Sequence, residues 1–207
     1  MASDWTEYYE AAGDEPRSTL LDALERFDAE EPQERFGVDL GCGAGPDTAE
    51  LLRRGWRVLA IDGQAEAIDR LRSRADLSPA DFLRLQSRVS SFQDARWPEA
   101  DLVNSSFALP FCPPEAFPDL WERILRSLRT GAMFSGHLFG DRDGWSAEED
   151  MTFHTREQVQ ALLEPLEAER FEDIEEDGET ATGKPKHWHV YYLVARRPYL
   201  SSRTGGR

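Results

Sequence analysis

The sequence predicts an α/β fold in which a doubly wound, mostly parallel sheet of about seven strands has helices on both faces and an antiparallel last strand. Two observations lead to this prediction. Apolar segments of strand length alternate with helical patterns through most of the chain, which is typical of βαβ units. In addition, the first apolar segment runs into three alternating glycines, Gly41, Gly43 and Gly45, directly before a helical pattern.

The parallel part of the sheet is predicted from five apolar segments. They cover residues 35–39, 56–61, 82–86, 101–104 and 132–139. A helix is expected over 18–27, where apolar residues recur at helical spacing. Pro46 suits the first turn of the next helix, and Gly55 suits its end.

After residue 140 the pattern changes from alternating strands and helices to a loop, a helix and a hairpin. Thr155 can cap the helix, with Gln158 at the capping-box position. Strands over 171–175 and 188–195 flank a polar segment with Gly178, Gly183 and Pro185, which predicts an antiparallel hairpin at the sheet edge. We expect residues 201–207 to be disordered.

Composition indicates one globular domain over residues 1–200. The chain has 207 residues, 40% of them apolar, and its apolar runs fall short of the roughly 18 residues of a membrane span. The first residues lack the basic flank and apolar stretch of a signal peptide, so a cytoplasmic location is expected. Two cysteines, Cys42 and Cys112, are too few for a disulfide framework or a thiolate metal site, and we expect no metal.

The charge balance argues against a nucleic-acid partner. The net charge is −16, and Lys184 and Lys186 are the lysines of the chain. A phosphate backbone would be repelled by most of such a surface. We therefore expect a small-molecule substrate, with no nucleic acid and no membrane as partner, and a monomer or homodimer.

The glycine-rich turn predicts a nucleoside cofactor without phosphate. A dinucleotide-binding turn usually reads G-x-G-x-x-G, whereas here the glycines alternate and Pro46 follows. Asp39 would crowd a phosphate but suits a ligand with an ammonium group. The second strand ends in Asp62, 21 positions after Gly41, where a carboxylate can accept bonds from ribose hydroxyls.

From Asp39 to Gly45 the chain resembles class I S-adenosylmethionine-dependent methyltransferases, whose first motif is an acidic residue followed by x-G-x-G-x-G. Trp5, Tyr8, Tyr9 and the segment 104–111 look like the small-molecule branch that includes tellurite-resistance-type enzymes. The resemblance implies a Rossmann-like fold, S-adenosylmethionine as cofactor and a small methyl acceptor. It also implies lid helices over 1–30, a cofactor-binding core over 35–140 and an acceptor-side part over 141–200.

The resemblance also implies a set of cofactor-binding residues. Asp39, Gly41, Cys42 and Gly43 would surround the methionine part, and Asp62 the ribose. The other candidates are Tyr9 in a lid, Arg17 as a partner of the methionine carboxylate, Gly63, Gln64, Ser91 and Phe92 beside the adenine, and Asn104 and Ser105 at the end of the fourth strand. Serine at position 91 departs from the usual acidic residue, which Asp94 could replace if the register differs.

The candidates for catalysis are His137, Asp141 and His154, on the acceptor side of the cleft. A base is needed only for a protonated acceptor. Phe107 and Leu109 could either form an apolar wall over the transferred methyl or belong to the core. His187 and His189 share one strand face without a third metal ligand, and they are interpreted as a strand feature.

Two alternative functions stay open from the sequence. A NAD-binding oxidoreductase would need a phosphate-compatible turn and a catalytic Tyr-x-x-x-Lys, which this chain lacks. A non-catalytic cofactor-binding or scaffold protein of the same fold is compatible with every motif described above.

Overall fold

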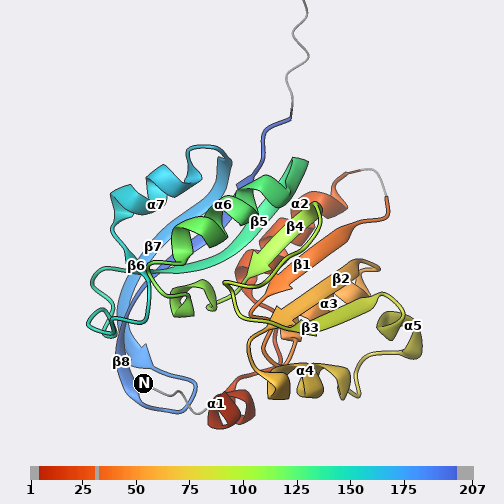
Figure 1. The fold of residues 1–207 in the computed structure, drawn as a ribbon, viewed down its shortest axis with the longest axis horizontal. Helices are drawn as coiled ribbons and strands as arrows, with labels where there is room; N and C mark the ends of the chain where they lie inside the picture. Colours follow the sequence, from red (N-terminus) through yellow and green to blue (C-terminus); the bar gives the residue numbers. More distant parts are fainter. Residues whose placement is uncertain (1–4, 31–32, 200–207) are drawn as a thin grey trace, which may run out of the picture.

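A computed structural model describes residues 5–30 and 33–199, which form one mixed sheet with helices around it (Figure 1). The strand order is β3-β2-β1-β4-β5-β8-β7, and β6 pairs with β5 outside this path. The strands are β1 (Phe36–Leu40), β2 (Arg57–Asp62), β3 (Leu85–Val89), β4 (Ala100–Ser105), β5 (Leu128–Gly140), β6 (Phe153–His154), β7 (Glu167–Glu179) and β8 (Pro185–Arg196).

The described helices are short, and most of them connect consecutive strands. They are α1 (Trp5–Ala11), α2 (Ser18–Asp28), α3 (Pro46–Arg53), α4 (Ala65–Arg72), α5 (Pro79–Phe82), the 3-10 turn η1 (Leu109–Phe111), α6 (Phe117–Ser127) and α7 (Arg156–Leu163). The predicted helix over 18–27 is confirmed by α2, and the predicted caps Pro46 and Thr155 begin α3 and precede α7.

The parallel strands bring their carboxyl ends to one edge of the sheet. β1 pairs with β2 on one side and with β4 on the other, so the chain reverses its winding direction at β1. Asp39 is level with Ala60 of β2 and with Asn104 of β4. Ligands of doubly wound folds bind outside the carboxyl ends of the strands at such a reversal.

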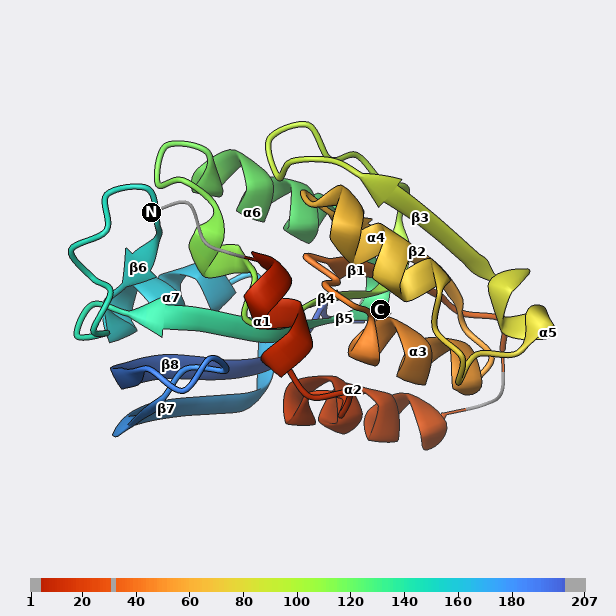
Figure 2. The ribbon, with the colours of Figure 1, turned by 90° about the horizontal axis from the view of Figure 1, so that it is seen from below.

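Two apolar layers bury the faces of the sheet, as expected for a doubly wound fold. On one face, side chains of α2 and α3 pack with Val58 and Leu102. On the other, side chains of α6 and α7 pack with Ile61 and Val103. Figure 2 shows α6 and α2 on opposite sides of the sheet. The predicted α/β class, with an antiparallel strand at the end of the chain, is confirmed.

Two element boundaries differ from the sequence prediction. The strand predicted over 82–86 is wrong by about three residues, because Ser78 and Asp81 form a capping box that holds Pro79–Phe82 as the helix α5. The short strand β6 was not predicted, since two residues carry no periodicity.

The predicted terminal hairpin is confirmed, but both strands are longer than expected. β7 and β8 pair from Glu167 and Arg196 to Glu179 and Pro185. Most of the polar segment predicted as a loop is therefore strand, and the turn is confined to residues 180–184. The acidic side chains fit there because β7 is an edge strand whose outer positions face solvent.

A buried ion pair ties the loop after β5 to β8. The Nζ of Lys186 lies 2.8 Å from Oδ1 of Asp143, and both side chains are at most 1% exposed. A second contact joins the backbone N–H of His189 to Oδ2 of Asp143, at 3.2 Å. Paired charges that are this deeply buried fix the loop, because losing either one leaves the other without a partner.

We expect Lys186→Met to lower the free energy of unfolding by about 2–4 kcal/mol, because Asp143 would remain buried without its cation. Lys184→Met is the matched control: Lys184 is exposed on the same hairpin, and its loss should change stability by less than about 0.5 kcal/mol. Urea denaturation measures both values. Equal stabilities of the two variants would contradict the importance of the pair.

Candidate functional site

A cavity of about 2300 Å³ opens at the carboxyl edge of the sheet. Its wall contains the glycine turn after β1, the end of β2, residues 106–108 after β4 and parts of β7 and β8. Helix α1 lies on the side toward which β1 and β4 point (Figure 1). The cavity therefore lies at the position that the winding reversal predicts.

The glycine turn is fixed to β2 by backbone hydrogen bonds. The N–H groups of Gly41 and Cys42 both donate to the carbonyl of Ile61, at 2.7 and 3.1 Å. Gly41 has φ +69°, and a Cβ there would lie 2.2 Å from the Cβ of Ala108. Glycine is required at this position because both the backbone conformation and the close approach exclude a side chain.

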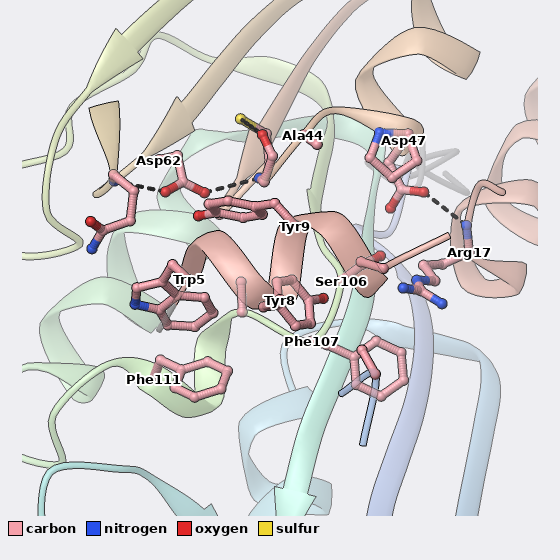
Figure 3. A pocket seen from close by; sticks show the side chains of 18 of the residues that line it. Trp5, Tyr8, Tyr9, Arg17, Ala44, Asp47, Asp62, Ser106, Phe107 and Phe111 are labelled. Carbon is pink, nitrogen blue, oxygen red and sulfur yellow. Dashed lines mark hydrogen bonds between the residues drawn. The ribbon is translucent and has the colours of Figure 1, made fainter. Parts of the chain in front are cut away.

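Asp62 closes the turn from the side of β2. Its Oδ2 accepts the N–H of Gly43 at 2.9 Å, and its Oδ1 accepts the N–H of Gln64 at 2.8 Å. Burial raises the pKa of Asp62, while these backbone donors oppose the shift. Figure 3 shows the carboxylate in the cavity wall beside the ring of Tyr9.

A second acidic group lies beneath the turn. Asn104 donates from Nδ2 to Asp39 and to Asp47, at 2.9 Å each, and accepts from Ser135. Thr48 donates to the other oxygen of Asp39 at 2.6 Å. Burial, together with the neighbouring Asp47, raises the pKa of Asp39 to about 7. Two carboxylates at one cavity wall favour a ligand with positive charge.

Sequence reasoning missed Asp47. It lies in the first turn of α3, where an acidic residue is easily interpreted as a helix-dipole partner. In the structure it lines the cavity and accepts the backbone N–H of Arg17 at 2.8 Å. The predicted residue Arg17 also lines the cavity, and its guanidinium lies 5.4 Å from the centre of the Phe107 ring.

Helix α1 spans the opening with three aromatic side chains. Tyr9 is 7% exposed, its ring would meet a Cβ on Gly43 at 3.6 Å, and burial raises its pKa. Trp5 stacks on Tyr9 and meets Phe111 edge-on, with ring centres 5.0 Å apart in the second contact. Figure 3 shows Tyr9 toward Asp62 and Trp5 toward Phe111, so α1 contacts both ends of the cavity.

The predicted adenine end consists of short loop segments. Gly63, Gln64, Ser91 and Phe92 all line the cavity, and so does Gln93, which was not predicted. Asp94 is absent from the described lining and accepts the Ser91 hydroxyl at 2.9 Å. The suggestion that Asp94 replaces the missing acidic residue therefore finds no support in its position.

The other end of the cavity has a wall of aromatic rings. The sequence left open whether Phe107 and Leu109 line the cavity or belong to the core. Phe107 lines the cavity, whereas Leu109 is fully buried in the core. Phe107 has φ +55°, a strained conformation for a bulky side chain. The rings that line the cavity are Trp5, Tyr8, Tyr9, Phe92, Phe107, Phe111, Phe139, Trp145, Trp188 and Tyr192.

The three predicted catalytic residues are not in the described lining of the cavity. His137 is fully buried under Phe107, with ring centres 3.9 Å apart, and neither ring nitrogen has a hydrogen-bond partner. Burial, with the charges of Arg17 and Arg170, lowers the pKa of His137 to about 3. Phe107, from the loop after β4, and Tyr192 of β8 both pack against the ring of His137.

Asp141 and His154 are displaced from the cavity for different reasons. Asp141 is exposed in the loop after β5, near Arg142. His154 lies in β6 against Phe117, and burial lowers its pKa to about 4. The structure thus places His137, Asp141 and His154 outside the described cavity lining, and their role at the acceptor stays a prediction.

Asn104 and Ser105 are also corrected from direct cofactor contacts to buried supports. Both are fully buried and neither belongs to the described cavity wall. The Ser105 hydroxyl donates to the carbonyl of Leu40 at 2.9 Å. Both side chains hold β4 against β1, because each of them donates a hydrogen bond to a residue of β1. Cys42, by contrast, does line the cavity, and burial raises the pKa of its thiol.

Within 5–30 and 33–199, no group of three histidine, cysteine or acidic side chains could hold a metal ion. In the same part of the chain, every helix is too short or too polar to cross a bilayer. Cys42 and Cys112 are both free and buried.

A family model described as a methyltransferase domain matches residues 38–131. This segment contains Asp39, the glycine turn, Asp62 and all of β4, and it ends within β5. No curated protein matches the sequence. The match supports the predicted methyltransferase class for the part of the chain that contains the glycine turn.

Solved structures show the same fold at low sequence identity. TehB from Haemophilus influenzae superposes with a TM-score of 0.73 at 16% identity, over 87% of this chain and 62% of that one. This chain therefore spans less than two thirds of the TehB chain. An N1-methyltransferase for 1,6-didemethyltoxoflavin from Burkholderia thailandensis, bound to its substrate and S-adenosylhomocysteine, gives 0.62 at 17%, over 94% and 80%.

A third structure, the geranyl diphosphate C-methyltransferase from Streptomyces coelicolor A3(2), gives a TM-score of 0.62 at 18% identity, over 86% of this chain and 78% of that one. It contains Mg²⁺, geranyl diphosphate and S-adenosylhomocysteine. The descriptions of the last two proteins name chemically different acceptors, 1,6-didemethyltoxoflavin and geranyl diphosphate, so the shared fold does not specify an acceptor.

We expect the free energy of unfolding to fall less in His137→Phe than in the parent protein when the pH is lowered. Between its ordinary pKa near 6.5 and the folded value of about 3, His137 binds a proton in the unfolded chain but not in the native one. The contribution of neutral His137 to the free energy of unfolding is therefore fully present above pH 6.5 and is lost as the pH falls toward 3. Urea denaturation should show that His137→Phe loses about 1–2 kcal/mol less than the parent between pH 7 and 5.

The matched control for this variant is His187→Phe. His187 lies between Asp177 and Glu175 on the surface, and these partners raise its pKa. Removing His187 cannot reduce the loss of stability at low pH, because its pKa is raised in the native protein whereas that of His137 is lowered. Parallel pH profiles for His137→Phe and the parent would contradict the assignment of a buried, neutral His137.

Proposed function

We propose that this protein transfers the methyl group of S-adenosylmethionine to a small-molecule acceptor that binds at the aromatic end of the cavity. The acceptor attacks the methyl carbon in line with the carbon–sulfur bond, and the sulfur leaves as the neutral thioether of S-adenosylhomocysteine. Because the sulfonium is already a good leaving group, the protein contributes mainly alignment and electrostatic stabilisation.

The proposal assigns the cofactor to the residues that line the turn. Asp62 accepts bonds from the ribose hydroxyls, while Gly41 and Gly43 allow the methionine part to approach the backbone. Asp39 and Asp47 face the positive end of that part. The remaining assignments are Cys42 at the turn, Tyr9 and Arg17 at the lid side, and Gly63, Gln64, Ser91 and Phe92 around the adenine.

One observation carries the choice of cofactor. In a dinucleotide-binding turn, free backbone N–H groups meet the pyrophosphate. Here the N–H groups of Gly41 and Cys42 are bonded to Ile61, and that of Gly43 is bonded to the carboxylate of Asp62. The turn thus presents negative charge instead of donors, which supports a cationic, phosphate-free adenosyl ligand over NAD.

The proposal also includes the finer expectations from the sequence. Residues 1–200 act as one domain, with residues 1–30 as a lid, 35–140 as the cofactor-binding core and 141–200 as the acceptor side. The protein works in the cytoplasm as a monomer or homodimer and does not bind nucleic acid. Asn104 and Ser105 act as positioning residues, because they hold Asp39 and β1 in place without lining the cavity.

Calorimetric titration of the full chain tests the choice of cofactor. We expect S-adenosylmethionine and S-adenosylhomocysteine to bind at one site and NAD to show no binding, because the acidic turn repels its pyrophosphate. Binding of NAD without either adenosyl ligand would overturn the proposal. Radiolabelled methyl transfer to an acceptor panel then separates an enzyme from a non-catalytic binding protein.

We expect Asp62→Ala to weaken S-adenosylhomocysteine binding by about 1–3 kcal/mol, because charge-assisted bonds to the ribose are lost. Asp94→Ala is the matched control, since Asp94 is exposed and absent from the described cavity lining. Calorimetry gives both affinities, and circular dichroism checks the fold. An unchanged affinity in folded Asp62→Ala protein would contradict the ribose assignment.

A further inference from the structure

We infer that the methyl acceptor is a planar heteroaromatic molecule with an uncharged ring nitrogen, and that its methylation produces an N-methyl cation held by the aromatic wall. This inference rests on the proposed function, because it assumes a methyl donor at the glycine turn. It goes further by naming the chemical class of the acceptor and the fate of the positive charge.

The acceptor end of the cavity is built from neighbouring aromatic rings. Phe139, Trp145 and Trp188 form one group, with ring centres 5.8–6.2 Å apart. Phe111 connects this group to Trp5 of α1, through ring distances of 6.3 Å to Trp145 and 5.0 Å to Trp5. A wall of this kind matches a flat aromatic ligand, which can meet ring faces and edges at similar distances.

The same rings already hold a cation in this protein. The ammonium of Lys186 lies 3.4, 3.9 and 4.3 Å from the ring centres of Trp188, Trp145 and Phe139. Asp143 balances its charge from the other side, at 2.8 Å. Cations within about 6 Å of a ring centre are attracted by the face of the ring. Trp145 and Trp188 are partly exposed in the cavity wall, so a ligand can contact them there, whereas Phe139 is 1% exposed and supports them from behind.

The charges around the cavity oppose an anionic acceptor. Glu148, Asp150 and Glu176 line it together with the aromatic residues. The basic residues of the lining near this end are Arg17 and Lys184, and the charge of Lys186 on the same rings is paired with Asp143. Along the whole described lining, carboxylates outnumber basic groups. A carboxylate or diphosphate acceptor would therefore meet net repulsion, whereas a cationic product is stabilised.

The proton balance supports an unprotonated nucleophile. A nucleophile that attacks with a free lone pair needs none of the predicted bases His137, His154 and Asp141, which are absent from the described lining. A ring nitrogen attacks with its lone pair, the carbon–sulfur bond breaks, and no proton has to leave. The positive charge moves from sulfur to nitrogen, so a wall that stabilises a cation there also stabilises the transition state.

Binding to the complex with S-adenosylhomocysteine tests this inference without knowledge of the natural acceptor. The probes are N-methylquinolinium as a product-like cation and 2-naphthoate as an anion of similar shape. Calorimetry with the full chain should show N-methylquinolinium binding at least about 10-fold more tightly than 2-naphthoate. Equal affinity, tighter binding of the anion, or no binding of the cation would overturn the inference.

Two substitutions at Trp145 distinguish attraction of the cation by the ring face from apolar contact alone. Trp145→Leu should weaken N-methylquinolinium binding about 3- to 30-fold, whereas Trp145→Phe should retain most of the affinity. Trp188→Leu is a second variant in case the first does not fold. Trp97→Phe is the control, since the Trp97 indole donates to Ser127 and is absent from the described cavity wall. Wild-type affinity in both folded leucine variants would overturn the inference.

Failure of the inference is distinguishable from failure of the proposed function. The affinity for S-adenosylhomocysteine is measured first, in every variant. If it is absent in the parent protein, the proposed function fails. If S-adenosylhomocysteine binds but the cation is not preferred, the acceptor class alone is wrong.

Discussion

The bond between the Asp62 carboxylate and the N–H of Gly43 is the contact on which the site depends, because it joins the ends of β1 and β2 across the turn. With Gly41 and Cys42 bonded to Ile61, it leaves the turn with acceptors in place of free donors. Asp39 and Asp47 add further negative charge beneath it, and Asn104 bridges the two. The negative charge of this cavity wall thus follows from how the two strands are joined.

The sequence predicted those features that follow from local chemistry. Alternating glycines and an acidic residue at the end of each of two strands predict a ligand-binding turn, and Asp39, Gly41, Gly43 and Asp62 all line the cavity. The helix at 18–27 and the terminal hairpin were predicted because their periodicity or turn residues are strong.

The failures have a common physical cause, which is that side-chain direction depends on tertiary packing. His137 is on the expected strand, but strand alternation and the cover of Phe107 place its ring inside the sheet layer. Asn104 ends the expected strand, yet its amide satisfies two buried carboxylates instead of a ligand. Asp47 was overlooked because a first-turn carboxylate has an ordinary helical explanation.

Helix α1 has a consequence for the order of events in a catalytic cycle. A seven-residue helix is not stable alone in water, so α1 persists through the docking of Trp5 and Tyr9. Tyr9 lies beside Gly43 and Trp5 packs on Phe111, so the helix covers both the glycine turn and the edge of the aromatic wall. Under the proposed function, detachment of α1 would expose both regions in one movement, so that spent cofactor and methylated product would share one exit.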